Sequence, residues 1–67
     1  MQHRRIKYPH LASVLALDPR PKYLIAALSG VAPNRFGMIL SGRVEPTVNE
    51  CERIAEIVGG DVEHLFG

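Results

Sequence analysis

The stretch from Leu24 to Thr47 most constrains how this chain of 67 residues can fold, because it indicates two short helices joined at a single glycine. A helix that ends at Gly30 can place this residue in the left-handed backbone conformation, which glycine adopts without the steric penalty of a Cβ atom. Pro33 favours the first turn of a new helix, where its missing N–H costs no hydrogen bond. The sequence therefore predicts one helix at about residues 21–29 and a second at about residues 32–41.

Apolar side chains on both helices predict a close, buried crossing. The first helix is expected to direct Ile25, Ala26 and Leu28 inward, and the small side chain of Ala26 lets the second helix approach. Apolar residues at helical spacing predict the buried face of the second helix. These residues are Phe36, Ile39 and Leu40. A glycine at position 42 is expected to end this helix.

An earlier apolar pattern predicts another helix at about residues 9–17. Leu11, Val14 and Leu15 fall at helical spacing within it. The following segment, residues 18–21, holds two prolines, which the interior of a helix does not accommodate. This helix is therefore expected to end before the helix at residues 21–29 begins.

The C-terminal third of the chain predicts two more helices. Thr47 and Glu50 have the spacing of a capping box, in which each side chain accepts a hydrogen bond from the backbone N–H of the other residue. A pair of glycines ends the apolar stripe that follows. The predicted stripe consists of Val48, Cys51, Ile54, Ala55 and Val58. Asp61 is expected to cap a last short helix that carries Phe66 toward the core.

The central stretch resembles the helix-turn-helix of the phage-repressor-like family, the Cro and XRE type. The similarity rests on a small residue in the first helix, a Gly-Val turn, two apolar residues in the second helix, and a glycine followed by Pro-Thr. In this order, the residues are Ala26, Gly30, Val31, Phe36, Ile39, Gly42, Pro46 and Thr47. It continues through residues 52–66. The resemblance implies an all-α fold, a small five-helix lambda-repressor-like helix-turn-helix domain at residues 9–67. It also implies a DNA-binding, repressor-like transcriptional regulator that docks the helix at residues 32–41 in the major groove.

Helical geometry then indicates which side chains would face DNA. A step of 100° per residue from the buried face places Asn34, Met38 and Ser41 at the outward centre, with Arg35 beside them. Asn34 can pair with adenine, Arg35 can pair with guanine or reach a phosphate, and Met38 can contact a thymine methyl group. We interpret these three residues as base-reading.

Other side chains are candidates for phosphate contacts. The resemblance places Lys22, at the start of the first helix of the motif, and Ser41 and Arg43, at the end of the second, near the DNA backbone. Residues 1–8 are basic and lack helical periodicity, so we interpret them as a flexible arm, although the same composition is typical of a solvated tail. The arm side chains that could lie along phosphates are Arg4, Arg5 and Lys7.

The distribution of charge supports a polyanionic partner more than the net charge of +1 does. Residues 1–43 carry seven basic side chains and one acidic side chain, a charge of +6. Residues 44–67 carry one basic and six acidic side chains, a charge of −5. This asymmetry would orient the domain with its helix-turn-helix half toward DNA. Two solvated faces with chance asymmetry are the alternative.

Other classes of function find little support in the sequence. We find no nucleophile-base constellation and no glycine-rich phosphate loop, so we expect no enzymatic activity, cofactor or small-molecule ligand. The spacings of His3, His10, Cys51 and His64 match no compact zinc pattern, so we expect no metal. A single cysteine suits a buried thiol in a reducing, cytoplasmic setting. No apolar stretch approaches the length of a membrane span.

Two interpretations of function stay open at this point. The first is the DNA-binding regulator, for which the resemblance also implies a homodimer that reads two half-sites. The second is a protein-interaction module that keeps the helix-turn-helix fold without specific DNA reading. Gly37 and Met38 favour the second, because polar residues are usual at these places in the resembled family.

Overall fold

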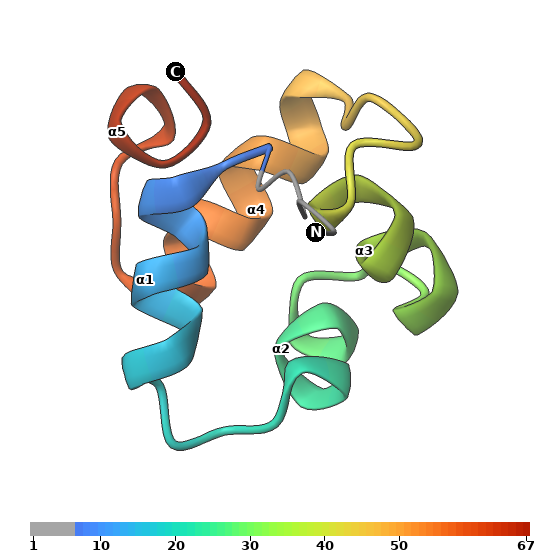
Figure 1. The fold of residues 1–67 in the computed structure, drawn as a ribbon. Helices are drawn as coiled ribbons and strands as arrows, with labels where there is room; N and C mark the ends of the chain where they lie inside the picture. The colour runs from blue at the N-terminus through green and yellow to red at the C-terminus, as the bar shows by residue number, and fades with distance from the viewer. Residues whose placement is uncertain (1–6) are drawn as a thin grey trace, which may run out of the picture.

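The computed structural model describes residues 7–67, and this part of the chain forms five α-helices joined by short loops (Figure 1). The helices are α1 (Pro9–Leu17), α2 (Lys22–Leu28), α3 (Pro33–Leu40), α4 (Val48–Val58) and α5 (Val62–Phe66). The predicted all-α, five-helix architecture is confirmed. The predicted ends of the first three helices lie within one residue of the observed ends.

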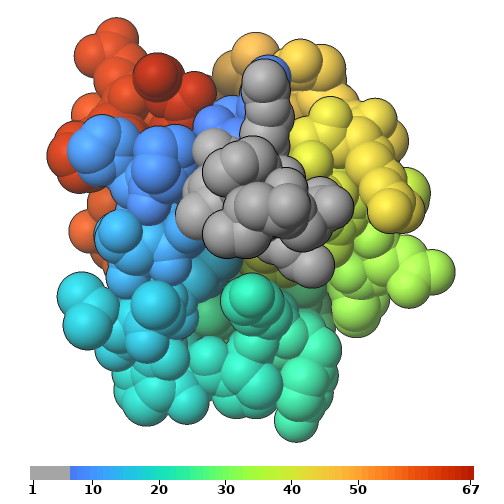
Figure 2. All heavy atoms as spheres, in the orientation of Figure 1, coloured from blue at the N-terminus to red at the C-terminus, as the bar shows by residue number. Residues whose placement is uncertain are grey.

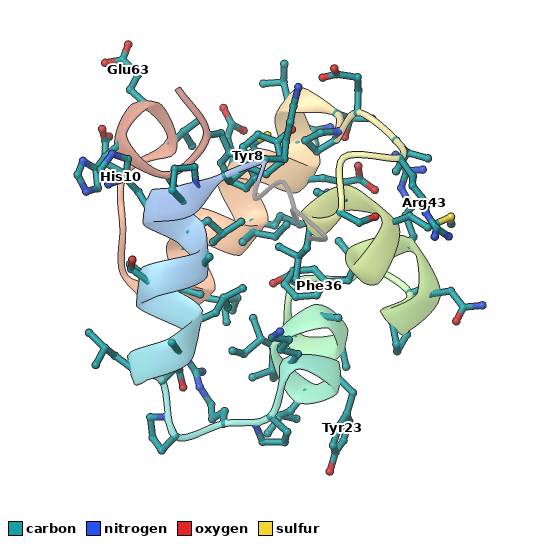
Figure 3. The ribbon with its side chains drawn as sticks, viewed as in Figure 1. Tyr8, His10, Tyr23, Phe36, Arg43 and Glu63 are labelled. Carbon is teal, nitrogen blue, oxygen red and sulfur yellow. The ribbon has the colours of Figure 1, made fainter. Side chains whose placement is uncertain are left out.

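All five helices contribute to one apolar core. The core side chains lie on the inner faces predicted by the helical spacing, and the ring of Phe36 points toward the centre of the domain (Figure 3). Cys51 is also buried, and this burial raises the pKa of its thiol. The buried apolar cluster consists of Tyr8, Leu11, Leu15, Ile25, Ala26, Val31, Phe36, Ile39, Ile54, Ala55 and Leu65.

The turn between α2 and α3 has the predicted geometry. Gly30 adopts a positive φ of 73°. Its backbone N–H donates to the carbonyl of Ala27 at 3.0 Å, and the next N–H, of Val31, donates to the carbonyl of Ala26 at 2.9 Å. These two bonds form the Schellman ending, which satisfies the last carbonyls of a helix and reverses the chain. As a result, α3 leaves α2 at 109°.

Two apolar residues that were predicted to face the core are exposed instead. Leu28 is 51% exposed, because the inner stripe of α2 continues from Ile25 to Ser29, four residues later. The Ser29 hydroxyl is buried there and donates to the carbonyl of Ile25 at 2.7 Å. Val48 is 72% exposed, because Glu50 occupies the buried position in the first turn of α4.

Details at both ends of the domain also differ from the prediction. Tyr8 was assigned to the arm, yet it is buried and its ring meets Phe66 edge-on at 5.1 Å between centroids. Tyr8 is therefore part of the packed domain, and Phe66 is only half-buried. Asp61 occupies the N-cap position of α5 but makes no capping hydrogen bond through its side chain. The predictions for Arg4 and Arg5 lie outside the described residues.

Candidate functional site

One side of α3 faces the core and the other faces solvent. Phe36 and Ile39 are buried on the inner side, where α3 packs against α2. Figure 1 and the space-filling view in Figure 2 show α3 and the loop after it at the margin of the domain. On the outer side, Asn34 and Ser41 are exposed and Met38 is half-buried, as the helical period predicts.

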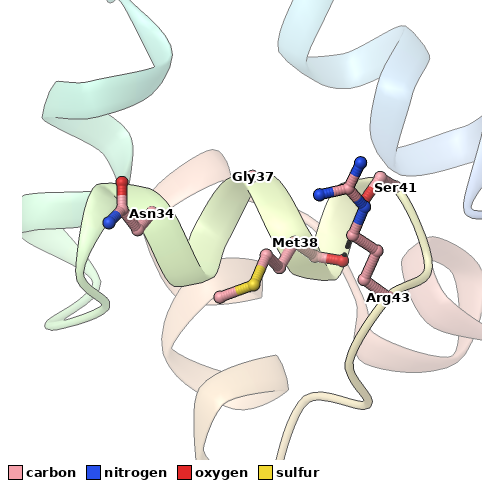
Figure 4. A pocket seen from close by; sticks show the side chains of 5 residues that line it. All are labelled: Asn34, Gly37, Met38, Ser41 and Arg43. Atoms are coloured by element: carbon pink, nitrogen blue, oxygen red, sulfur yellow. Dashed lines mark hydrogen bonds between the residues drawn. The ribbon is translucent and has the colours of Figure 1, made fainter.

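The outer side of α3 forms an open depression of about 480 Å³ with the loop that follows (Figure 4). Its lining is Asn34, Gly37, Met38, Ser41 and Arg43. In Figure 4 the thioether of Met38 lies between Asn34 at one end and Arg43 at the other. A Cβ atom placed on Gly37 would meet nothing within 4 Å, so bare backbone borders the depression at this position. The predicted outward residues are therefore brought together in one place.

Arg43 joins this surface because of the way in which α3 ends. Gly42 adopts a positive φ of 82°, and the N–H of Arg43 donates to the carbonyl of Met38 at 2.8 Å. The Ser41 hydroxyl donates to the same carbonyl at 3.1 Å. The Schellman ending fixes where the Arg43 side chain leaves the backbone. Figure 3 shows this side chain directed away from the core.

Arg35, which was predicted to read a base, is engaged in an ion pair within the domain. Its Nε–H donates to Oε2 of Glu50 at 2.6 Å, and its Nη2 donates to Oε1 at 2.9 Å. This two-point ion pair joins α3 to the first turn of α4 and directs the guanidinium away from the depression. The sequence did not predict this contact, because Glu50 lies 15 residues away in the chain.

Glu50 is the acceptor on which this junction depends. It is only 8% exposed, and its Oε1 also accepts the N–H of Thr47 at 2.9 Å. The Thr47 hydroxyl accepts the N–H of Glu50 at 3.1 Å, which completes the predicted capping box. Hydrogen bonds from Arg35 and from the Thr47 backbone lower the pKa of Glu50 to about 2 from its ordinary value of 4.5.

Two more arginines are engaged within the fold. Arg20 forms a two-point ion pair with Asp18 and also donates to the carbonyl of Ile57 at 2.9 Å. Arg53 donates from Nε to the carbonyl of Ser29 at 2.7 Å. From the sequence, both residues were expected only to contribute to the charge of the chain. The close spacing of the Asp18 and Arg20 side chains was the one signal that could have indicated a local pair.

The remaining described cations are Lys7, Lys22 and Arg43, and none of them forms an ion pair with another described residue. Lys22 is exposed at the first position of α2. The Cβ, Cδ and Cγ atoms of Lys7 lie 3.5, 3.6 and 3.7 Å from the place that a Cβ of Gly42 would occupy. The structure thus brings Lys7 beside the loop that carries Arg43.

An exposed aromatic residue near Lys22 was not among the predicted site residues. Tyr23 is 66% exposed on α2, and Figure 3 shows its hydroxyl directed away from the body of the domain. A phenolic O–H can donate to an anionic oxygen. The sequence placed Tyr23 only at the margin of the buried face, because the rotation of so short a helix is not determined by its own residues.

Residues 7–67 contain neither a metal-binding cluster nor a single helix that could span a membrane. No group of three or more His, Cys, Asp or Glu side chains there could hold a metal ion. The rings of His10 and His64 lie 4.4 Å apart at the junction of α1 and α5, without a third ligand of this kind. No single helix in this range is long and apolar enough to cross a membrane, and α2 and α3 meet the length and composition criteria only as a pair bent by 109°.

Comparisons of the chain with protein-family models, with curated proteins and with solved structures found no match.

Proposed function

We propose that this chain binds double-stranded DNA by placing the outer side of α3 in the major groove, as a repressor-like transcriptional regulator of the Cro and XRE type. The observation that carries the proposal is the depression along α3, whose side chains the fold leaves exposed and which Arg43 borders. A major groove about 12 Å wide admits an α-helix. The 109° turn between α2 and α3 also lies within the range of about 90–120° that is typical of helix-turn-helix motifs.

In this proposal, the phosphate contacts come from both sides of α3. Lys22 opens α2, while Ser41 and Arg43 follow the last turn of α3, and Lys7 lies beside the same loop. These cations are not neutralised by another described residue, so their charge is available to a polyanion. Phosphate contacts of this kind would set the register of the domain on the duplex without reading its sequence.

Base reading is assigned to Asn34 and Met38. The exposed amide of Asn34 can donate to N7 and accept from N6 of adenine at one end of the depression. Met38 offers only apolar contact in the middle. Because Arg35 is held by Glu50, the proposal assigns no guanine contact to it.

The cellular setting and assembly follow from the same proposal. A domain with one reading helix binds a palindromic site as a homodimer, with half-sites about one helical turn apart. We place the protein in the cytoplasm, in contact with the nucleoid, and assign it neither a cofactor nor a small-molecule ligand. Duplex DNA and a second copy of the chain are thus its proposed partners.

A salt titration tests the proposal. Binding of the chain to a fluorescent duplex should weaken linearly in a plot of log affinity against log salt concentration, with a slope of roughly −3 if Lys7, Lys22 and Arg43 each contact a phosphate. Lys22→Ala should reduce the size of this slope by about 1 and weaken all duplexes alike. The matched control, Lys22→Arg, should preserve the slope because it preserves the charge.

Absence of duplex binding at micromolar protein, or binding that is independent of salt, would contradict the proposal and favour the protein-interaction module. The apolar surface available to such a module is small, because Leu40 is half-buried and packs against the core. Only Met38 and the backbone of Gly37 then remain as apolar lining of the depression.

A further inference from the structure

The middle of the depression lacks polar side chains. Asn34 stands at one end and Ser41 and Arg43 at the other, while Gly37 and Met38 lie between them. A Cβ atom on Gly37 would meet no atom from another part of the described chain within 4 Å, so a base edge could approach the helix backbone closely at this point. We call the surface formed by Gly37 and Met38 the apolar strip.

The chemistry of base edges determines what this strip can accept. In the major groove, guanine and adenine present polar acceptors or donors, and cytosine presents an amino group. A polar edge pressed against the apolar strip would lose its water without gaining a hydrogen bond, which is unfavourable. The C5 methyl group of thymine is the one major-groove feature that gains from burial against a thioether and a glycine.

We propose that the apolar strip recognises the C5 methyl group of a pyrimidine, so that the preferred duplex carries thymine opposite Met38. The inference rests on the proposed function and deepens it by naming the chemical group that α3 selects. Since 5-methylcytosine presents the same methyl group at the same position, it should be accepted better than cytosine at this base pair. The neighbouring base pair, read by Asn34, should prefer adenine.

Removal of single methyl groups tests this inference directly. A duplex is first selected from a random pool with the full chain, and each thymine is then replaced by deoxyuridine, which differs only in the missing methyl group. At one or two positions the wild-type chain should bind the deoxyuridine duplex about fourfold more weakly, the factor expected for burial of one methyl group. Replacement of thymine elsewhere in the duplex should leave the affinity unchanged.

Variants at Met38 link this effect to the side chain. Met38→Gln has a similar length but a polar end, and it should bind thymine and deoxyuridine duplexes equally. Met38→Leu retains an apolar contact and should retain the preference. Asn34→Ala should weaken adenine selection and leave the methyl effect intact.

The outcomes separate this inference from the proposed function. If no duplex is enriched and none binds, both are overturned. If a selected duplex binds with the expected salt dependence but every deoxyuridine replacement is neutral, the apolar strip does not recognise methyl groups and only the inference is overturned. A methyl effect that persists in Met38→Gln would likewise overturn the assignment to Met38.

Discussion

Helices α3 and α4 follow one another in the chain and are joined by the ion pair of Arg35 and Glu50, yet their residues are used in different ways. α4 begins with a complete capping box, buries the carboxylate of Glu50 in a two-point ion pair and ends at a left-handed glycine. α3 has no side-chain cap, begins with Pro33 and carries Gly37 in its interior. Interior glycine costs about 1 kcal/mol relative to alanine. The polar features of α4 are explained by the stability of the fold, whereas the outer side of α3 is not.

The difference between the two helices indicates where function resides. A buried side chain on either helix has a structural reason for its identity, because it fills the core or satisfies a backbone group. On the outer side of α3 no such reason exists for Asn34, Gly37 or Met38, since they are at the surface and line a depression. These residues are therefore the ones whose replacement should change binding more than stability.

The largest expected loss of stability comes from a substitution on the inner side of α3, and the matching substitution on the outer side should cost little. Phe36→Ala should cost about 3–5 kcal/mol, because it removes a completely buried ring. A core of this size contributes roughly that amount in total, so the variant should be largely unfolded at 25 °C by circular dichroism. Met38→Ala, on the opposite side, should melt within a few degrees of the wild type. A folded Phe36→Ala variant would contradict the assignment of the inner side.

A smaller loss is expected when the junction between α3 and α4 is broken. Glu50→Ala removes the acceptor for Arg35 and for the Thr47 backbone, and it should cost about 2 kcal/mol. Thermal melting should show this as a decrease in Tm of roughly 10 °C for a domain of this size. Glu56→Ala is the matched control, since Glu56 is exposed on the same helix and should change the free energy of unfolding by less than about 0.5 kcal/mol.

Arg35→Ala tests whether Arg35 stabilises the junction of α3 and α4 or reads a base. If Arg35 serves the fold, this variant should lose stability, but less than Glu50→Ala because the bond from the Thr47 backbone to Glu50 remains, and the double variant should lose little more than Glu50→Ala alone. Its base preferences in a selected-duplex panel should match those of the wild type. A variant with unchanged Tm and relaxed base preference would instead restore the base-reading role.

The pH dependence of unfolding gives a third measure of the junction. The Glu50 carboxyl ionises near pH 4.5 in the unfolded chain and near pH 2 in the folded chain, so the unfolded chain binds more protons between these values. The stabilisation from this group is present above about pH 5 and is lost as the pH falls toward 2. Asp18, whose pKa is lowered to about 2 by Arg20, acts in the same direction. Urea unfolding of Glu50→Gln should therefore depend less steeply on pH than that of the wild type.

Local sequence signals predicted most of the fold. The Gly30 turn and the capping box at Thr47 depend on backbone chemistry within a few residues, and both are confirmed. The exposure of Leu28 was not predicted, because it depends on the rotation of α2 against its neighbours. The partner of Arg35 lies 15 residues away, so the ion pair depends on how the fold places α3 and α4, which local sequence signals do not determine. The outward positions of Asn34, Met38 and Ser41 were predicted because one helical period determines them, whereas Arg43 joins the depression through the turn at Gly42.

The smallest expected change in stability is the most informative about the outer side of α3. Gly37→Ala should stabilise the domain by about 0.4–1 kcal/mol, because the backbone is helical there and a Cβ atom meets nothing within 4 Å. If α3 docks in the major groove with its backbone close to a base edge, the same methyl group should weaken duplex binding severalfold. The Tm of the variant would then be higher than that of the wild type, while its affinity for the duplex would be lower.

If Gly37→Ala leaves duplex affinity unchanged, Gly37 has no role in recognition. Gly60→Ala is a useful contrast, because a Cβ atom there would lie 2.7 Å from a methyl carbon of Leu65 and should destabilise the fold rather than affect the groove. A Gly37→Ala variant with a higher Tm and unchanged duplex affinity would mean that DNA does not approach the α3 backbone. The glycine in α3 would then lower the stability of the domain without serving recognition. The difference between α3 and α4 would be a difference in helix stability only.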